Sequence, residues 1–215
     1  MPISSGNVYK QIRNITSKLI SLNLSVEQNF PSKQQGNISY SGCKDISVAL
    51  KNIAYEEIYK TLEESKNYNI KMIDGALIHF LYNFELNQLR SHRLAFFPAP
   101  NLESFQNEPE LYEDDEIYTD ILDKNIVTFP VRFDYDPANF QELDHPKSHV
   151  TFGQYKNCRI PVSEPLTPNV FINFILRNFY NTAFHKFAHE IPSGDYFFDK
   201  TITKKEQKIL HLGIY

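Results

Sequence analysis

The sequence contains no tryptophan and only two cysteines, Cys43 and Cys158, among its 215 residues. Two cysteines cannot build the disulfide framework of a small secreted domain, so we expect a protein of the reducing cytosol. No apolar run approaches the roughly 20 residues that span a bilayer, and the first residues lack the apolar core of a signal peptide. We therefore expect a cytoplasmic protein with no membrane partner.

The short motifs that bind common cofactors are also missing. The chain has no Walker loop, no dinucleotide-binding GxGxxG and no GxSxG nucleophile motif. A net charge of −4 and a pI near 6.0 argue against a surface coated with basic residues for nucleic acid, although they leave room for a local basic pocket. We therefore expect no cofactor.

Carboxylates gather in one stretch, Asn101–Glu116, which is rich in Asp and Glu. Such a cluster could hold a metal ion, but its spacing fits no calcium-binding loop. We interpret it as a solvated loop that leads into the first turns of a helix ending near Asp123.

What the chain does have is apolar and aromatic material for a large core. Hydrophobic residues make up 41% of the sequence and aromatic residues 14%. Because neither internal repeats nor a low-complexity linker divide it, we expect a single domain over 1–215. Within that domain we expect a helical N-terminal part (1–66), a sheet-plus-helix core (70–187) and a C-terminal tail (188–215).

Apolar residues at three- and four-residue steps predict helices in both halves of the chain. The clearest helix start is Thr167, a capping residue followed by Pro168 at the first helical position. Asp45 is a second candidate cap. The predicted helices are Val8–Leu24, Asp45 to about Ser65, Thr167 to about Phe187 and Thr203–Leu212. The polar, turn-rich segment Phe30–Cys43 is interpreted as a loop.

Two-residue alternation of side chains predicts strands between these helices. Gly75–Phe84 is apolar on both alternating faces and predicts a buried strand, although so apolar a run also fits a helix. His92–Phe97 forms its antiparallel partner, with Glu85–Ser91 as the connection. The further predicted strands are Ile126–Asp136, Pro146–Gly153 and Cys158–Val162.

Together these elements predict an α+β fold: an antiparallel sheet of about five strands, packed on one face by the C-terminal helix, with N-terminal helices alongside. In Ile126–Asp136, Phe133 and its neighbours form an apolar face, whereas Arg132 and Asp134 lie on the opposite face. A strand of this kind belongs to a sheet that is covered on one side only.

The uncovered face is where we expect chemistry, because same-face residues on adjacent strands come within side-chain reach. A histidine can move a proton near neutral pH, and arginines can hold a phosphate by paired hydrogen bonds. We predict His149 as general base or acid, Asp134 as its orienting carboxylate, and Arg132 and Arg159 as phosphate ligands. The expected substrate-binding residues are Lys147, Arg93 and His145. A plain structural ion-pair network is the alternative for this group.

Three other side-chain pairs could bear chemistry. His145 and His149, four residues apart, suggest zinc, but Pro146 argues against a helix between them, and we expect no metal ligands there. His185 and His189 are a second metal candidate, with a solvated helix end as the alternative. A Cys158–His149 nucleophile pair requires an exposed thiol, and Cys158 fits better in the core.

Three blocks carry a family resemblance: residues 74–101 (DGALIHFLYNFE and HRLAFFPAPN), 131–136 (VRFDYD) and 145–180 (HPKSHVTFG, then CRIPVSEPLTPNVFINFILRNFY). Over about residues 70–185 the chain resembles a bacterial family described only as a domain of unknown function. The resemblance implies a cytosolic bacterial protein of the kind encoded in mobile and phage-defence islands. The RFDYD strand before the HPKSH turn is also similar to small RNase toxins of toxin–antitoxin pairs, although their paired His-Lys-His turn is absent.

Two functions remain open at this stage. The first is a nucleic-acid-directed, RNase-like effector, or a component of a phage-defence or toxin–antitoxin system, with RNA or a nucleotide as substrate. The second is a non-catalytic subunit that docks a protein encoded by a neighbouring gene, through the acidic stretch 103–116 or an exposed aromatic surface. Whether the protein is an enzyme is not decided by the sequence.

Overall fold

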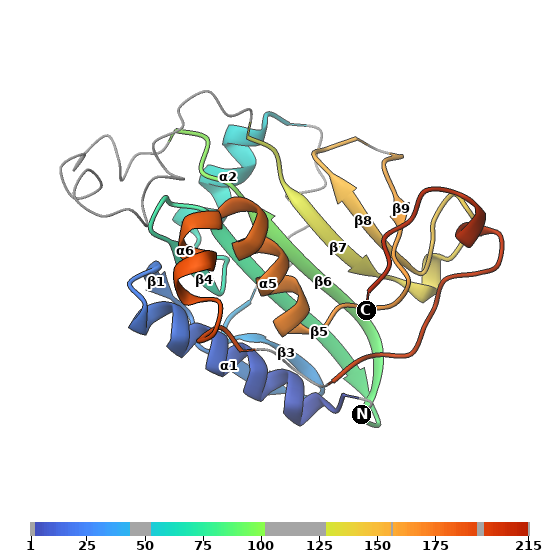
Figure 1. Ribbon diagram of the computed structural model, residues 1–215, viewed down its shortest axis with the longest axis horizontal. Coiled ribbons are helices and arrows are strands. Elements are labelled where there is room, and N and C mark those ends of the chain that lie inside the picture. Colours follow the sequence, from blue (N-terminus) through green and yellow to red (C-terminus); the bar gives the residue numbers. More distant parts are fainter. Residues whose placement is uncertain (1–2, 44–52, 102–127, 156, 193–195, 215) are drawn as a thin grey trace.

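The computed structural model describes residues 3–43, 53–101, 128–155, 157–192 and 196–214, and it has a mixed α+β fold (Figure 1). The strands of these ranges form one nine-stranded antiparallel sheet. Its main path runs β1-β4-β5-β6-β7-β8-β9, and a β2–β3 hairpin joins at β5. The strands are β1 Ser25–Gln28, β2 Pro31–Gln34, β3 Asn37–Tyr40, β4 Ile70–Met72, β5 Leu77–Glu85, β6 Gln88–Phe97, β7 Val131–Tyr135, β8 Ser148–Phe152 and β9 Ile160–Pro161.

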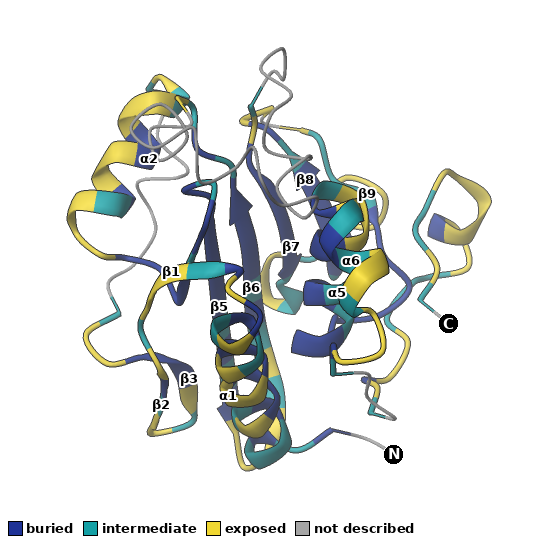
Figure 2. Cartoon of the chain, turned by 60° about the vertical axis from the view of Figure 1, so that its left-hand side comes forward, coloured by how far each residue is buried: buried dark blue, intermediate teal, exposed yellow. Residues whose placement is uncertain are grey.

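Helices cover the sheet unequally. The helices are α1 Ser5–Ser21, α2 Tyr55–Glu64, α5 Pro168–Phe179 and α6 Asn181–Phe187, and short 3-10 turns occupy Pro137–Asn139 and Glu206–Lys208. Figure 2 shows α1, α5 and α6 against one face and α2 on the other. The predicted C-terminal helix thus lies where we expected it.

The main core lies between β5–β8 and the pair α1 and α5. Phe133 on β7 meets Phe171 and Phe174 of α5 edge-on, with ring centroids 6.0 and 5.3 Å apart. Phe80 on β5 meets the same Phe171 at 5.6 Å. These contacts confirm that the odd-numbered apolar side chains of β7 point into the core, so Arg132 and Asp134 must point to the opposite face.

On that opposite face, α2 covers only one end of the sheet. Its buried side chains Ile58, Tyr59 and Leu62 form a second, smaller core with Leu77 and other residues at one end of β5 and β6. The rest of the face is not covered by a helix among the described residues. The expectation of a sheet covered on one side only is therefore right for the part that carries Arg132 and Asp134.

The interpretation of Phe30–Cys43 as a loop was wrong, because β2 and β3 form a hairpin there. The segment is rich in polar residues because this hairpin lies off the main path of the sheet and exposes much of its surface, and those residues suggested a loop. Ile38 nevertheless pairs with Tyr82 on β5 and is fully buried. Gly36, with φ +87°, makes the turn that a side chain would strain.

Several predicted boundaries also change. Thr167 caps α5 as expected, but the helix breaks at Tyr180 (φ −133°, ψ 54°), and α6 follows as a separate helix. The predicted helix Thr203–Leu212 is only a 3-10 turn. The segment from Asp45 to residue 52 lies outside the described residues, and α2 begins at Tyr55 with Ala54 as its cap.

The connection between β5 and β6 is tighter than predicted. Leu86 and Asn87 alone form the turn, with φ values of +48° and +63° that suit a two-residue hairpin. Strands β1 and β4 were not predicted, because each is only three or four residues long. None of the described helices is long and apolar enough to cross a membrane.

Candidate anion-binding and acid–base site

Four adjacent strands place polar side chains in two parallel rows on the uncovered face. One row reads Leu81, Arg93, Asp134 and His149, which are direct partners across β5, β6, β7 and β8. The next row along the strands pairs Arg132 with Thr151. Neighbouring strands lie about 4.8 Å apart, so side chains from residues 93–149 of the sequence come within direct reach of one another.

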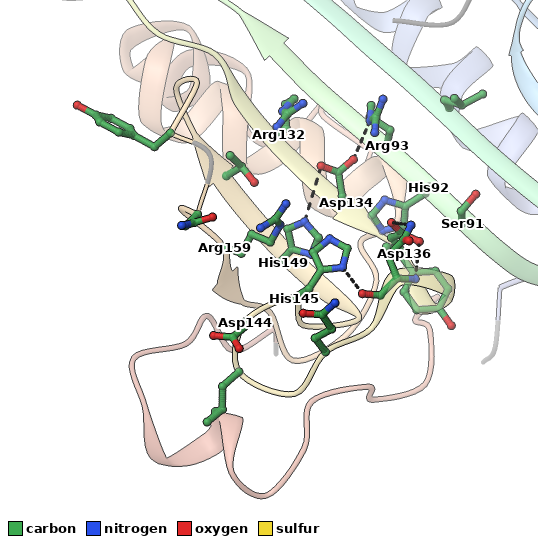
Figure 3. A pocket seen from close by; sticks show the side chains of 18 of the residues that line it. Ser91, His92, Arg93, Arg132, Asp134, Asp136, Asp144, His145, His149 and Arg159 are labelled. Atoms are coloured by element: carbon green, nitrogen blue, oxygen red, sulfur yellow. Dashed lines mark hydrogen bonds and ion pairs between the residues drawn. The ribbon is translucent and has the colours of Figure 1, made fainter. Parts of the chain in front are cut away.

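These rows form the floor of a pocket of about 1350 Å³ (Figure 3). Six of the seven residues that the sequence proposed line it, namely Arg93, Arg132, Asp134, His145, His149 and Arg159. The seventh, Lys147, does not line the pocket, and its ammonium lies 5.1 Å from the ring centroid of Phe140.

Asp134 is the negative centre of the pocket. Nε of Arg93 donates to its Oδ1 at 2.8 Å, and Nε2 of His149 lies 4.0 Å from its Oδ2. Burial alone would raise the Asp134 pKa, but the charges of Arg93, Arg132 and His149 together hold that pKa below its ordinary value. Asp134 is therefore ionised near neutral pH.

Arg132 is a buried cation in the pocket lining. It is only 9% exposed, yet neither Nε nor Nη1 has a hydrogen-bond partner among the described residues. Buried polar groups are normally hydrogen-bonded, and leaving a charged donor unpaired costs free energy. Burial lowers the Arg132 pKa, which Asp134 partly opposes. A guanidinium in this state can bind an anion that enters the pocket.

His149 is held in one tautomer by the backbone. Its Nδ1 lies 2.8 Å from the carbonyl oxygen of Pro146, and a carbonyl only accepts, so Nδ1 carries the hydrogen. Nε2 of the neutral ring is then the acceptor nitrogen, and it lies on the Asp134 side. Burial lowers the His149 pKa, against the opposing effect of Asp134, so the ring is neutral near pH 7 and Nε2 can accept a proton.

The proposed orienting role of Asp134 therefore changes in detail, because Pro146 and not Asp134 makes the hydrogen bond that orients the ring. At 4.0 Å the carboxylate is beyond hydrogen-bond distance of Nε2. It is close enough to stabilise the imidazolium that forms when Nε2 takes up a proton.

His145 repeats this arrangement beside it. Nδ1 of His145 lies 2.6 Å from the carbonyl oxygen of Asn139, which again fixes the tautomer with hydrogen on Nδ1. The two imidazole ring centroids are 4.8 Å apart. Asp136 shapes the connecting loop by accepting the Asn139 N–H at the start of the 3-10 turn. One histidine from the turn before β8 and one from β8 itself thus line the same pocket.

Some lining residues were missed by sequence reasoning. Tyr155 and Asn157 come from the loop between β8 and β9, and Asn83 and Ser91 from β5 and β6. Only the alternation of β5 and β6 could have indicated Asn83 and Ser91. Tyr155 carried no signal, because it lies in a connection whose path depends on the two strands.

The Cys158–His149 and His185–His189 pairs do not come together in this pocket, because Cys158, His185 and His189 lie outside its lining. Cys158 lies just before β9, half-buried and outside the pocket lining, so it is neither in a strand nor fully in the core. His189 lies near the end of α6, with Nε2 3.9 Å from Glu190. Within the described ranges no three His, Cys, Asp or Glu side chains cluster as metal ligands. The acidic stretch 103–116 lies outside those ranges.

Comparison with known proteins leads to a family and not to an activity. Neither a curated protein nor a solved structure matches the chain significantly. A family model described as "Uncharacterized conserved protein (DUF2290)" matches residues 24–214, which include every strand of the sheet and all residues of the pocket. The chain therefore belongs to the DUF2290 family of uncharacterized conserved proteins.

Proposed function

We propose that this protein cleaves RNA phosphodiester bonds by acid–base catalysis that uses its own side chains. The observation that carries the proposal is that a buried arginine shares one pocket with two histidines. Nε and Nη1 of this arginine, Arg132, have no hydrogen-bond partner among the described residues, and both histidines turn Nδ1 to a backbone carbonyl oxygen. Arginine is suited to hold a phosphate, and histidine is suited to move protons near neutral pH.

Arg132 would bind a non-bridging oxygen of the scissile phosphate through its guanidinium, which lines the pocket. Arg159, which lines the same pocket, would take a second oxygen. Arg93 is committed to Asp134 through its Nε, so its role is to help hold that carboxylate. Fixed donors stabilise the negative charge that accumulates on the phosphoryl oxygens as the reaction proceeds.

His149 would act as the general base. Its Nε2 accepts the proton of the ribose 2′-OH while the 2′ oxygen forms a bond to phosphorus. The imidazolium produced then lies beside the carboxylate of Asp134, which stabilises it. Replacing a general base of this kind costs about 10²- to 10⁴-fold in rate.

His145 would act as the general acid. In its imidazolium form, which keeps the Nδ1 hydrogen bond to Asn139 and carries a second proton on Nε2, it donates the Nε2 proton to the 5′ oxygen as the bond from that oxygen to phosphorus breaks. One proton leaves the 2′ oxygen and one reaches the 5′ oxygen, so the step is balanced. The products are a 2′,3′-cyclic phosphate and a free 5′-hydroxyl end.

The test uses purified protein, a short single-stranded RNA and excess EDTA. We expect cleavage with cyclic-phosphate ends, and a chimeric oligonucleotide with a 2′-deoxyribose at the cleaved position should be resistant. His149→Ala and His145→Ala should each lower the rate at least about 10²-fold. Lys147→Ala, which alters a cation outside the pocket, is the matched control and should stay active.

Full activity of His149→Ala and Arg132→Ala, or no cleavage of any RNA, would overturn the catalytic proposal. We extend the proposal to a role as an effector in a phage-defence or toxin–antitoxin system, for which the sequence resemblance is the support. Expression should then slow growth and fragment RNA in cells, and His149→Ala should relieve both. Stable co-purification with a neighbouring gene product, without any cleavage, would favour a non-catalytic interaction subunit instead.

A further inference from the structure

We infer that the pocket takes a phosphate flanked by an unpaired base, and that this base stacks on Tyr155. The inference deepens the proposed function, since it names single-stranded RNA or an open loop as the substrate. It rests on the position, the exposure and the anchoring of one aromatic side chain at the rim of the pocket.

Tyr155 lies at the arginine end of the pocket. The strand β8 runs from the row of His149 to the row of Thr151, which is the partner of Arg132, and Gly153, Gln154 and Tyr155 follow the strand. Side chains two residues apart on a strand are about 6.7 Å apart. A ligand whose phosphate sits on Arg132 therefore has the histidines on one side and Tyr155 on the other.

The Tyr155 ring is open to a ligand. Its side chain is among the large hydrophobic side chains left exposed, at 77%, and it lines the pocket. A methyl group on Gly153 would lie 3.6 Å from the ring, so part of the ring edge rests beside the backbone of Gly153. Every nucleobase has an aromatic face that can stack on such a ring, without regard to sequence.

The chain next to Tyr155 is anchored to the rest of the protein at Gly153 and Gln154, and a turn bond closes behind Tyr155. The Gly153 N–H donates to the carbonyl oxygen of Pro130 at 2.7 Å, and the Cys158 N–H donates to that of Tyr155 at 3.2 Å. Nε2 of Gln154 donates to the carbonyl oxygen of Ile53 at 2.8 Å. A platform held in this way loses little further freedom when a base stacks on it.

A base within a duplex is paired and stacked on its neighbours, so it could not lie on Tyr155 without being opened. An unpaired base pays no such cost. The adjoining arginines give the phosphate a fixed position, so the aromatic ring and the cations together recognise a nucleotide of single-stranded RNA.

The experiment measures binding in a His149→Ala background, so that turnover does not interfere. The probe is a fluorescently labelled single-stranded RNA, compared with the same RNA carrying one abasic site at successive positions. Tyr155→Ala should weaken binding of the intact RNA by about 5- to 150-fold, and Tyr155→Phe should change it less than about twofold. Phe30→Ala, a half-exposed aromatic outside the pocket lining, is the matched control and should have no effect.

The abasic series decides the inference. At one position, removing the base should weaken binding to the parent protein about as much as Tyr155→Ala weakens binding of the intact RNA. Tyr155→Ala should not weaken binding of that abasic RNA any further. An equal effect of Tyr155→Ala on every abasic RNA, or no effect on the intact RNA, would overturn the stacking role. Tyr155-dependent binding without cleavage by the wild-type protein would leave this inference standing and refute the catalytic proposal alone.

Discussion

Arg93 and Asp134 occupy directly opposed positions on β6 and β7, and Nε of Arg93 lies 2.8 Å from Oδ1 of Asp134. The pair stands in the middle of the row that ends at His149. Because Asp134 is nearly buried and faces three cationic or titratable groups, its charge governs both the stability of the pocket and its electrostatics.

Asp134→Asn should destabilise the protein by about 3 kcal/mol, since it leaves Arg93 and Arg132 without their counter-charge. The Asp134 pKa is lowered in the fold, so its contribution is complete above the ordinary pKa of 3.8 and is lost as pH falls through the folded value. Urea unfolding of both proteins at pH 7 and at lower pH measures this. Asp136→Asn, on the neighbouring turn, is the control, and equal stability of the two variants would contradict the prediction.

Two buried histidines should make the fold sensitive to mild acid. Burial lowers the pKa of His79 to about 3 and that of His92 to about 4, from an ordinary 6.5. Above pH 6.5 both histidines are neutral in the folded and in the unfolded protein. Below pH 6.5 they take up protons in the unfolded chain but stay neutral in the folded one until the pH reaches their lowered pKa. Each histidine should then remove about 1.4 kcal/mol of stability per pH unit down to its folded pKa.

Denaturant unfolding between pH 6 and pH 4 tests this. The free energy of unfolding of the wild-type protein should fall more steeply with decreasing pH than that of His79→Gln, by about 1.4 kcal/mol per pH unit. His92→Gln should reduce the wild-type slope by a similar amount. A slope unaltered by both substitutions would show that neither ring is kept neutral in the folded protein.

Gly36 and Gly42 form a matched pair of turn glycines. Both have positive φ, at +87° and +80°, but a Cβ on Gly36 would lie 2.0 Å from the Phe84 carbonyl oxygen. A Cβ on Gly42 would have no heavy atom of the described residues within 4 Å. Gly36→Ala should therefore cost at least about 3 kcal/mol, and Gly42→Ala about 1 kcal/mol from backbone strain alone. Thermal unfolding of the two variants measures the difference, and similar losses would refute it.

Asp74 and Tyr180 link the β4–β5 turn to the junction of α5 and α6. The Tyr180 hydroxyl lies 2.8 and 2.9 Å from the two oxygens of Asp74, whose pKa is raised by burial. Tyr180→Phe should cost about 1–3 kcal/mol at neutral pH, because the carboxylate loses this donor. The loss should shrink as pH falls, since protonation removes the charge that needs the donor.

Chemical denaturation of wild type and Tyr180→Phe, from neutral pH into acid, measures the difference in their free energy of unfolding. Tyr9→Phe, at a half-exposed ring on α1, is the control and should stay within about 0.5 kcal/mol of wild type. A Tyr180→Phe penalty that grows in acid would contradict the explanation.

Local patterns in the sequence predicted a good part of this site. Alternation in β7 puts Phe133 on one face of the sheet and Arg132 and Asp134 on the other. Alternation in β8 likewise puts His149 and Val150 on different faces. Both assignments are confirmed by the register of the two strands. These predictions succeed because the side-chain period of a strand depends only on its own backbone.

The short or exposed elements were harder to predict. Strands β1 to β4 are three or four residues long, and several of their residues are polar. What makes them strands is pairing with segments far away in the chain, such as Ile38 with Tyr82. No local propensity contains that information, because β-structure depends on neighbours and burial.

Local sequence patterns are enough to predict which side chains share a face of each strand, where α5 begins, and that positive and negative groups lie on the side away from the apolar core. Strand pairing and packing in three dimensions put Arg93, Asp134 and His149 in one row and Lys147 over Phe140, outside the pocket lining. They also leave Nε and Nη1 of Arg132 without a hydrogen-bond partner in the described part of the chain. The physical reason is that periodicity is a property of one strand, whereas register and the loss of hydrogen-bond partners arise only when separate strands pair and exclude water.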